Sequence, residues 1–222
     1  MDIKNNINFF NREVTGPGGR LIAVGKTQPP EKLLEAYQAG QRIFGENKVQ
    51  EMTAKYEVLP KDIEWHMIGH LQSNKVKSIA PFVALIHSVD SFRLLEEINK
   101  QAKKINRIVP CLLQVHIAQE ETKFGFDEAE LFAVLENPAT QELAFIRIDG
   151  LMGMASLTED KDKIRSEFRH LRTLFQTLQS RKLPPQVTMT ELSMGMSSDY
   201  KIALEEGSTL VRIGTAIFGE RS

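Results

Sequence analysis

Lys26 is the residue of this sequence whose position most clearly suggests chemistry. It follows four apolar residues, 21–24, which are typical of a buried parallel strand. Gly25 ends the apolar run and the proline pair at 29–30 prevents its continuation, so Lys26 stands at the carboxyl end of the strand. A lysine whose stem is packed there can lose a proton and add to an aldehyde, forming a Schiff base. The alternative is a solvated lysine at a strand end, and the rest of the sequence has to decide.

Two segments near the end of the chain have the composition of a phosphate-binding site. Residues 192–199 read Leu-Ser-Met-Gly-Met-Ser-Ser-Asp, and residues 211–215 read Val-Arg-Ile-Gly-Thr. Small residues let the backbone approach a ligand closely, and serine hydroxyls can donate hydrogen bonds to phosphate oxygens. Glycine and serine are also common turn residues, so each segment alone is weak evidence.

The elements that would position these residues alternate between short apolar segments and amphipathic ones. The sequence predicts strands over residues 21–24, 42–47, 65–70, 85–90, 109–117, 146–151, 189–194 and 210–214. It predicts one helix before the first strand, over residues 2–13, and one after each of the first seven strands, among them 31–40, 127–135, 161–180 and 200–205.

Eight strands alternating with helices imply parallel pairing and right-handed crossovers, and eight such units close into a (β/α)8, or TIM, barrel. This α/β barrel would carry one extra N-terminal helix. An open doubly wound sheet is the main alternative, but no Gly-x-Gly-x-x-Gly motif follows the first strand. No linker or change of composition divides the chain, so residues 1–222 are expected to form a single domain.

A barrel would bring Lys26 and the two small-residue segments to one face. The carboxyl ends of all eight strands lie on that face, and the loops after strands seven and eight frequently hold phosphate groups. A Schiff-base lysine beside a phosphate site suits a phosphorylated aldehyde. Pyridoxal 5′-phosphate (PLP) is the obvious candidate cofactor.

The composition excludes several other classes of protein. The chain of 222 residues is 41% hydrophobic and 26% charged with a net charge of −1, which is ordinary for a soluble globule and offers no field for nucleic acid. No apolar run approaches the ~20 residues of a membrane span, and residues 1–6 lack the features of a signal peptide. The single cysteine, Cys111, lies in an apolar run and is expected to be buried and inert. We expect a cytoplasmic protein without a membrane or nucleic-acid partner.

No metal site is expected from the histidines. His66 and His70 are four residues apart, but a metal-binding pair at that spacing requires a helix, and this segment is a predicted strand with no glutamate between them. They are expected to line the barrel mouth or to make local hydrogen bonds.

Four motifs carry a family resemblance, at residues 44–51, 65–75, 192–199 and 211–219. They resemble the YggS/PROSC family of pyridoxal phosphate homeostasis proteins, and the similarity extends from about residue 21 to residue 221. Gly25, where the family usually has serine, and Lys48, where arginine is common, are mild departures that remove no expected ligand.

The resemblance implies the alanine-racemase-like PLP barrel (fold type III) with Lys26 as the Schiff-base lysine. It implies a cofactor-binding set of Lys26, Asn47, Ser193, Arg212, Gly214 and Thr215. Ser193, Gly214 and Thr215 would hold the phosphate, Asn47 would line the pocket, and Arg212 would face the pyridine nitrogen. A permanently charged arginine leaves that nitrogen unprotonated and so weakens the ring as an electron sink.

Whether such a protein catalyses a reaction depends on a second proton-transfer group. Racemases and decarboxylases that resemble this fold add a β-rich domain that dimerises and supplies a catalytic residue, and we expect no such domain in a sequence of 222 residues. A racemase needs an acid/base on each face of its intermediate, and only Lys26 can be named. No catalytic residue is therefore assigned.

The expected function is a PLP-binding protein, without established turnover, that binds, buffers or delivers PLP in the cell. Candidate recipients are apo forms of PLP-dependent enzymes, and the expected state is a monomer or a weak dimer. Two alternatives stay open: a PLP-dependent amino-acid racemase, and a phosphate-sugar barrel enzyme without PLP. The sequence does not decide whether a second PLP site exists on the surface.

Overall fold

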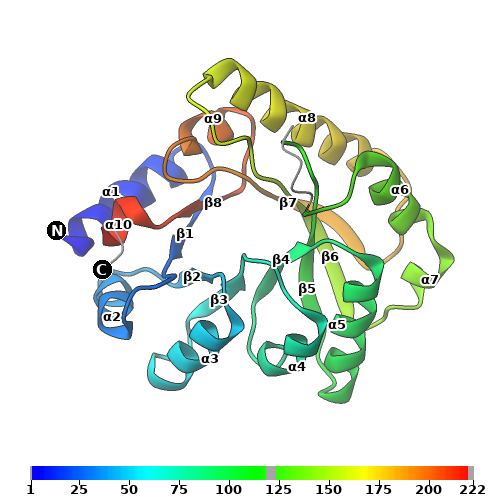
Figure 1. Cartoon of the computed structure of the whole chain (residues 1–222), viewed down its shortest axis with the longest axis horizontal. Helices are drawn as coiled ribbons and strands as arrows, with labels where there is room; N and C mark the ends of the chain where they lie inside the picture. The colour runs from blue at the N-terminus through cyan, green and yellow to red at the C-terminus, as the bar shows by residue number, and fades with distance from the viewer. Residues whose placement is uncertain (1, 119–123, 220–222) are drawn as a thin grey trace.

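Eight short apolar segments form a closed parallel barrel in a computed structural model that describes residues 2–118 and 124–219 (Figure 1). The strands are β1 (Arg20–Val24), β2 (Ile43–Glu46), β3 (Glu64–Met67), β4 (Leu85–Val89), β5 (Val109–Gln114), β6 (Ile146–Met152), β7 (Val187–Ser193) and β8 (Leu210–Ile213). Each strand pairs in parallel with the next, and β8 pairs with β1 to close the barrel. The predicted α/β barrel is confirmed.

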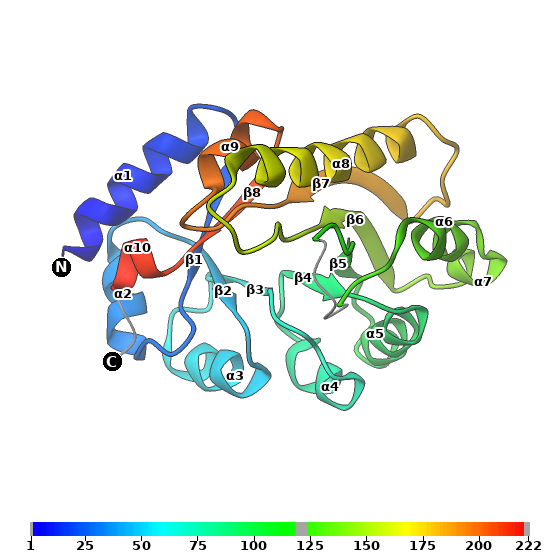
Figure 2. The ribbon, with the colours of Figure 1, turned by 45° about the horizontal axis from the view of Figure 1, so that its top comes forward.

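The helices surround this barrel (Figures 1 and 2). They are α1 (Ile3–Thr15), α2 (Pro30–Gln38), α3 (Val49–Val58), α4 (Val76–Ile79), α5 (Phe92–Lys104), α6 (Glu128–Glu136), α7 (Pro138–Gln141), α8 (Lys161–Gln179), α9 (Tyr200–Glu205) and α10 (Thr215–Phe218), with a 3-10 turn at Ser73–Lys75. The sequence pattern does not predict α7 or α10, each of which has four residues.

The extra N-terminal helix α1 packs on β1 and lies beside α2 and α10 (Figure 2). It buries Ile3, Ile7, Phe10 and Val14, whose spacing of three and four residues makes one apolar face. Asp2 caps the start of the helix by accepting a hydrogen bond from the backbone N–H of Asn5. The helix thereby covers the side of the barrel where β1 and β8 meet.

Three strands differ from the prediction by two or more residues at one end. β3 ends at Met67, β5 ends at Gln114, and β7 begins two residues earlier than predicted, at Val187. Within β7, Met189 has a φ of 44°, in the left-handed region, and the register with β6 shifts nearby. Such an irregularity depends on the neighbouring strand and is therefore not visible in an apolar pattern.

The barrel interior has an apolar layer and a polar layer. The apolar layer consists of Ile22, Leu85, Leu112, Met152 and Leu210. Every second side chain of a strand points inward, so His87 lies one level above Leu85, and Arg212 one level above Leu210, towards the carboxyl ends. The polar side chains that bond one another at this upper level are those of His66, His87, Ser193 and Arg212.

A larger apolar layer fills the space between the barrel and the helices, with Trp65, Phe44 and Phe168 among its fully buried members. Cys111 lies in this layer, and its burial raises the pKa of the thiol, so the cysteine is buried as predicted and poorly reactive. Over residues 2–118 and 124–219, no helix is both long and apolar enough to cross a membrane.

Candidate functional site

A cavity of about 440 Å³ opens at the carboxyl ends of the strands. Loops from six of the eight strands contribute to its wall. Of the six residues predicted to bind the cofactor, five line this cavity: Lys26, Asn47, Arg212, Gly214 and Thr215. The fold thus brings the strand-one lysine and the loop after strand eight to one place, as the sequence predicts.

Lys26 reaches the cavity because it follows β1 on the interior side, two residues after Val24, which lines the same cavity. The end of β1 is fixed to β2 by a hydrogen bond of 3.0 Å from the Gly25 N–H to the Gly45 carbonyl oxygen. Lys26 is half-buried, and within the described residues its Nζ makes no hydrogen bond or ion pair. The amine is therefore available to a ligand.

Asn47 lies beside Lys26 because it follows β2 in the same way. The loop after β3 packs directly against it: a Cβ atom on Gly69 would lie 2.4 Å from the Asn47 carbonyl oxygen. Only glycine allows this approach. The close packing of the two loops sets where the Asn47 side chain enters the cavity.

Unpaired hydrogen-bond donors gather where the loops after β7 and β8 meet. Ser197, Ser198, Gly214 and Thr215 all line the cavity. Within the described part of the chain, the backbone N–H groups of Ser197, Ser198 and Thr215 make no intramolecular hydrogen bond. Free N–H groups beside small side chains are the arrangement that binds phosphate oxygens.

Ser193 is the predicted phosphate ligand that the structure places elsewhere. It is fully buried inside the barrel, and its Oγ accepts a hydrogen bond of 2.5 Å from Arg212 Nη1 and lies 2.9 Å from His87 Nδ1. The reason is that residue 193 still belongs to β7, whereas the chain reaches the cavity only after a turn at Gly195, whose φ is 94°. Ser197 and Ser198 line the cavity in its stead.

Arg212 forms the floor of the cavity and is buried. Its Nη1 donates to Ser193 Oγ, and its Nη2 donates to the Gly153 carbonyl oxygen at 3.1 Å. Burial lowers the pKa of the guanidinium to about 10, an effect that the nearby Asp199 carboxylate opposes. Since this value lies well above neutral pH, Arg212 presents a positive charge to the cavity.

A chain of hydrogen bonds extends from Arg212 into the barrel. It passes through Ser193 to His87, whose Nε2 lies 2.9 Å from His66 Nδ1. Arginine has only donors, so Ser193 Oγ must accept from Arg212 and can use its own proton to donate to His87 Nδ1. We therefore assign the proton of His87 to Nε2, which donates to His66 Nδ1, because the opposite direction leaves a buried hydroxyl proton without an acceptor.

Both histidines of this chain are neutral at physiological pH. Burial lowers the pKa of His66 to about 3, with a smaller effect of Arg20. Burial also lowers the pKa of His87 well below its usual value, helped by the neighbouring His66, Arg212 and Arg20. The sequence signal for this chain is weak, since only alternation along β3 and β4 suggests that either histidine points inward.

The other predicted histidine behaves as a surface residue. His70 is half-exposed and its Nδ1 lies 3.1 Å from Asp90 Oδ2, so His66 and His70 do not form a pair. Within residues 2–118 and 124–219, no group of three or more His, Cys, Asp or Glu residues is arranged to hold a metal ion.

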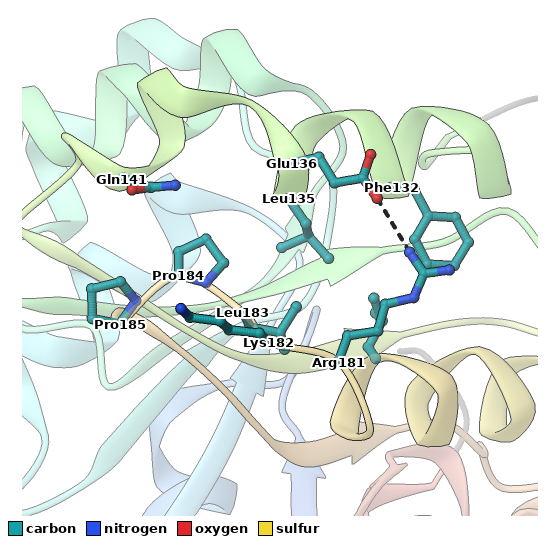
Figure 3. A pocket seen from close by; sticks show the side chains of 10 residues that line it. Phe132, Leu135, Glu136, Gln141, Arg181, Lys182, Leu183, Pro184 and Pro185 are labelled. Carbon is teal, nitrogen blue, oxygen red and sulfur yellow. Dashed lines mark hydrogen bonds and ion pairs between the residues drawn. The ribbon is translucent and has the colours of Figure 1, made fainter.

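A second cavity, of about 390 Å³, lies at the opposite, amino-terminal side of the barrel, between α6, α7 and the segment before β7 (Figure 3). Two of its three charged side chains, Arg181 and Glu136, are paired with each other. The Arg181 guanidinium lies 4.3 Å above the centre of the Phe132 ring, and its Nη1 is 3.2 Å from Glu136 Oε1. This cavity therefore offers less for an anionic ligand than the cavity around Lys26.

Comparison with known proteins identifies relatives over nearly the whole chain. The family model described as alanine racemase, N-terminal domain, matches residues 1–222. A pyridoxal phosphate homeostasis protein of Aquifex aeolicus is 44% identical over 91% of this chain and 87% of its own length. The protein of the same name from Vibrio alginolyticus is 41% identical, over 91% of this chain and 86% of its own.

Solved structures show the same fold. PipY of Synechococcus elongatus without PLP has a TM-score of 0.90 at 41% identity, covering 98% of this chain and 100% of PipY. PipY with PLP bound has a TM-score of 0.86 at 39% identity, with the same coverage. An alanine racemase of Bartonella henselae, 18% identical with a TM-score of 0.73, matches 99% of this chain but 59% of its own, and shows a shared fold.

Proposed function

Because this chain belongs to the pyridoxal phosphate homeostasis protein family, within the alanine racemase N-terminal domain family, we propose that it binds PLP as a Schiff base on Lys26 and serves in PLP homeostasis without catalytic turnover. PipY, at 39% identity, has a solved structure with PLP bound, and the relatives are named as homeostasis proteins. The observation that carries the proposal is the unpaired Lys26 amine in the same cavity as the free donors after β7 and β8.

The residues of the cavity fit the three polar parts of PLP. Lys26 would hold the aldehyde carbon, and the phosphate would accept hydrogen bonds from Ser197, Ser198 and Thr215, beside Gly214. Arg212 would face the pyridine nitrogen from the floor, with Asn47 along the side. Bound PLP supplies a carbonyl for imine formation and a ring that can withdraw electrons.

Arg212 suits a carrier better than a catalyst. A group that stays positively charged discourages protonation of the adjacent pyridine nitrogen, and an unprotonated ring is a weak electron sink. Ser193 and Gly153 accept two of the Arg212 hydrogen bonds, which hold the guanidinium in place. The relatives at 44% and 41% identity are named as pyridoxal phosphate homeostasis proteins.

The wall of the cavity also lacks the second proton-transfer group that racemisation needs. Among the described residues that line it, Lys26 and Arg212 are the only ones with titratable side chains. A racemase requires an acid/base on each face of the substrate carbon, and an arginine that stays charged does not serve as one. Of the residues that the structure describes around this cavity, Lys26 is the one that can move a proton.

The finer parts of the proposal concern the cell. We propose a cytoplasmic monomer or weak dimer that passes PLP to apo forms of PLP-dependent enzymes. An exposed carboxyl-end cavity supports transfer, because a bound molecule can leave it without unfolding of the barrel.

The proposal is tested by recording the absorption spectrum of the purified protein with PLP before and after borohydride, followed by peptide mapping. The expected result is a Schiff-base band that reduction fixes on Lys26 and that Lys26→Ala abolishes. Lys48→Ala, which removes an exposed lysine of the neighbouring loop, is the matched control and should retain the band. Labelling scattered over surface lysines and unchanged in Lys26→Ala would contradict the proposal.

The absence of turnover is tested separately. The PLP-loaded protein is incubated with each common amino acid in deuterated water, and exchange of the α-proton is followed by NMR. No exchange above that of free PLP is expected. Exchange that depends on Lys26 would instead identify a racemase-type enzyme, and a protein that stays colourless with PLP would favour a phosphate-sugar enzyme.

A further inference from the structure

Three side chains outside the cofactor cavity hold the backbone on both sides of Lys26. They are Glu46, at the end of β2, and Glu51 and Lys55, on α3, and together they are called the α3 clamp. Lys55 Nζ donates to the Gly25 carbonyl oxygen at 2.8 Å and to Glu46 Oε1 at 2.7 Å. The residue before Lys26 is therefore tied to α3 through a buried ion pair.

The residue after Lys26 is tied to the same helix. The Thr27 N–H donates to Glu51 Oε2 at 2.8 Å, and Glu51 Oε2 lies 3.8 Å from Lys55 Nζ. Thr27 has a φ of 64°, in the left-handed region, where a β-branched residue is rarely found. Its side chain is exposed, so packing does not impose this conformation. Two hydrogen bonds restrain it: the bond to Glu51, and the turn bond of 3.0 Å from the Gln28 N–H to the Gly25 carbonyl oxygen, which Lys55 also holds.

The ion pair of the clamp is poorly explained by stability alone. The side chains of Lys55 and Glu46 are 6% and 0% exposed, and Glu46 Oε2 has no hydrogen-bond partner among the described residues. Removing two charges from water is costly, and a well-packed apolar pair often gives equal or greater stability. Burial raises the pKa of Glu46 to about 7 against the opposing effects of Lys55 and Lys26, which shows how unfavourable the site is for a charge.

The clamp occupies space that Gly25 leaves free. A Cβ atom at position 25 would lie 2.8 Å from Glu46 Oε1 and 2.8 Å from Leu33 Cδ2. Without a side chain at this position, Glu46 and Lys55 can approach the backbone of the strand end directly.

We propose that Glu46, Glu51 and Lys55 are positioning residues that fix the Gly25–Lys26–Thr27 backbone so that the Lys26 amine meets the cofactor carbonyl. This inference rests on the proposed function of Lys26. The lysine side chain has four rotatable bonds, so the position of its amine can be no more precise than the position of its Cα. Small errors in the position of the amine strongly weaken its reaction with the cofactor carbonyl.

The first measurement needs no cofactor. Amide hydrogen exchange of the segment containing Thr27 is compared in the wild-type protein, Glu51→Leu and Lys55→Met. We expect at least about tenfold faster exchange in both variants. Glu51→Leu removes the acceptor of the Thr27 amide, and Lys55→Met removes the bond that holds the Gly25 carbonyl oxygen of the same turn. Glu57→Leu, on an exposed position of the same helix, is the matched control. Unchanged exchange in both clamp variants would overturn the proposal.

The second measurement separates positioning from stability. Lys55→Met is expected to lower stability, since it leaves the buried Glu46 unpaired, and to raise the Kd for PLP about tenfold. The double variant Glu46→Met/Lys55→Met replaces both partners by apolar side chains and should recover stability, while the Kd stays about tenfold raised. Recovery of both quantities together would overturn the proposal.

A conservative variant gives an additional readout. Glu51→Gln keeps an acceptor oxygen and is expected to restore most of the PLP affinity lost in Glu51→Leu. Equal affinities in these two variants would contradict a role of the Thr27 hydrogen bond. If the wild-type protein forms no Schiff base on Lys26, the proposed function fails, whereas the exchange measurement on the PLP-free protein still tests the clamp.

Discussion

At the scale of single residues, two serines of the segment 192–199 have different roles. Ser193 is buried and bonds Arg212 and His87, whereas Ser197 lines the cavity and keeps a free backbone N–H. A serine that connects a buried arginine to a buried histidine serves the structure. A serine on the cavity wall serves the ligand.

Substitution of these serines should therefore separate stability from binding. Ser193→Ala leaves Arg212 Nη1 without its acceptor and His87 Nδ1 without its donor, and we expect a loss of about 1–3 kcal/mol in the free energy of unfolding. Ser197→Ala should change that free energy by less than about 0.5 kcal/mol but weaken PLP binding several-fold. Denaturant unfolding and absorbance titration measure the two effects. If Ser193→Ala weakened PLP binding and Ser197→Ala lowered stability instead, Ser193 would be the phosphate ligand.

The buried histidines make stability depend on pH. In the folded protein the pKa of His66 is about 3 and that of His87 is also lowered, whereas both have ordinary values near 6.5 in the unfolded chain. At a pH between the folded and the unfolded pKa values, the unfolded chain binds more protons than the folded protein. The stability contributed by the neutral histidines is therefore fully present above about pH 6.5 and is lost as the pH falls. The expected slope is about 1.4 kcal/mol per pH unit for each histidine.

Denaturant unfolding between pH 8 and pH 5 checks this dependence. NMR of the imidazole nitrogens should show both rings neutral throughout, with the proton on Nε2. A His66 ring that becomes charged near pH 6 in the folded protein would contradict the prediction.

At the scale of elements, the cavity depends on loops that touch through their backbones. Asn47 after β2 and Gly69 after β3 are in direct contact, and Gly214 after β8 approaches β1 so closely that a Cβ would lie 3.0 Å from the Val24 carbonyl oxygen. These contacts set the shape of the cavity wall, since backbone atoms cannot move aside as a side chain can.

Gly69→Ala tests the contribution of this contact. The new Cβ would lie 2.4 Å from the Asn47 carbonyl oxygen and must displace the loop after β2. We expect an overpacking cost of about 1–3 kcal/mol in unfolding free energy, together with weaker PLP binding. Gly16→Ala, whose Cβ would lie 3.3 Å from the Arg12 carbonyl oxygen and far from the cavity, is the control. Unchanged PLP affinity in Gly69→Ala would show that the Asn47 loop does not shape the site.

At the scale of the whole molecule, closure of the barrel couples the site to the fold. β1, which carries Lys26 at its end, pairs with both β2 and β8, and β8 ends at Arg212 and Ile213. A ligand that contacts Lys26 and the loop after β8 therefore joins the two strands at which the barrel closes. Binding at the cavity should stabilise the molecule as a unit.

PLP should raise the unfolding temperature, because the added stability grows with the logarithm of the free PLP concentration divided by Kd. At a free concentration of 100 times Kd, a ligand that binds only the folded state adds about 2.7 kcal/mol. The shift should be largely lost in Lys26→Ala, and pyridoxine, which lacks the aldehyde and the phosphate, should produce none. A PLP shift of equal size in wild type and Lys26→Ala would locate binding elsewhere on the surface.

Much of this protein was determined by local sequence pattern. The alternation of apolar and amphipathic segments predicts the barrel, and the break at Gly25 places Lys26 at a strand end, because periodicity and chain-breaking residues act within a few positions. Small residues in 192–199 and 211–215 predict the segments that line the cavity after β7 and β8, for the same reason.

The tertiary structure alone decided which side chains meet. Ser193 and Ser197 lie four residues apart in one motif, yet the turn at Gly195 sends one into the barrel and the other to the cavity. The chain from Arg212 to His66 and the contact of Lys55 with Gly25 join residues of different elements. Such contacts depend on strand register, on whether each side chain points into or out of the barrel, and on its height along the barrel axis. All eight strands together set these properties.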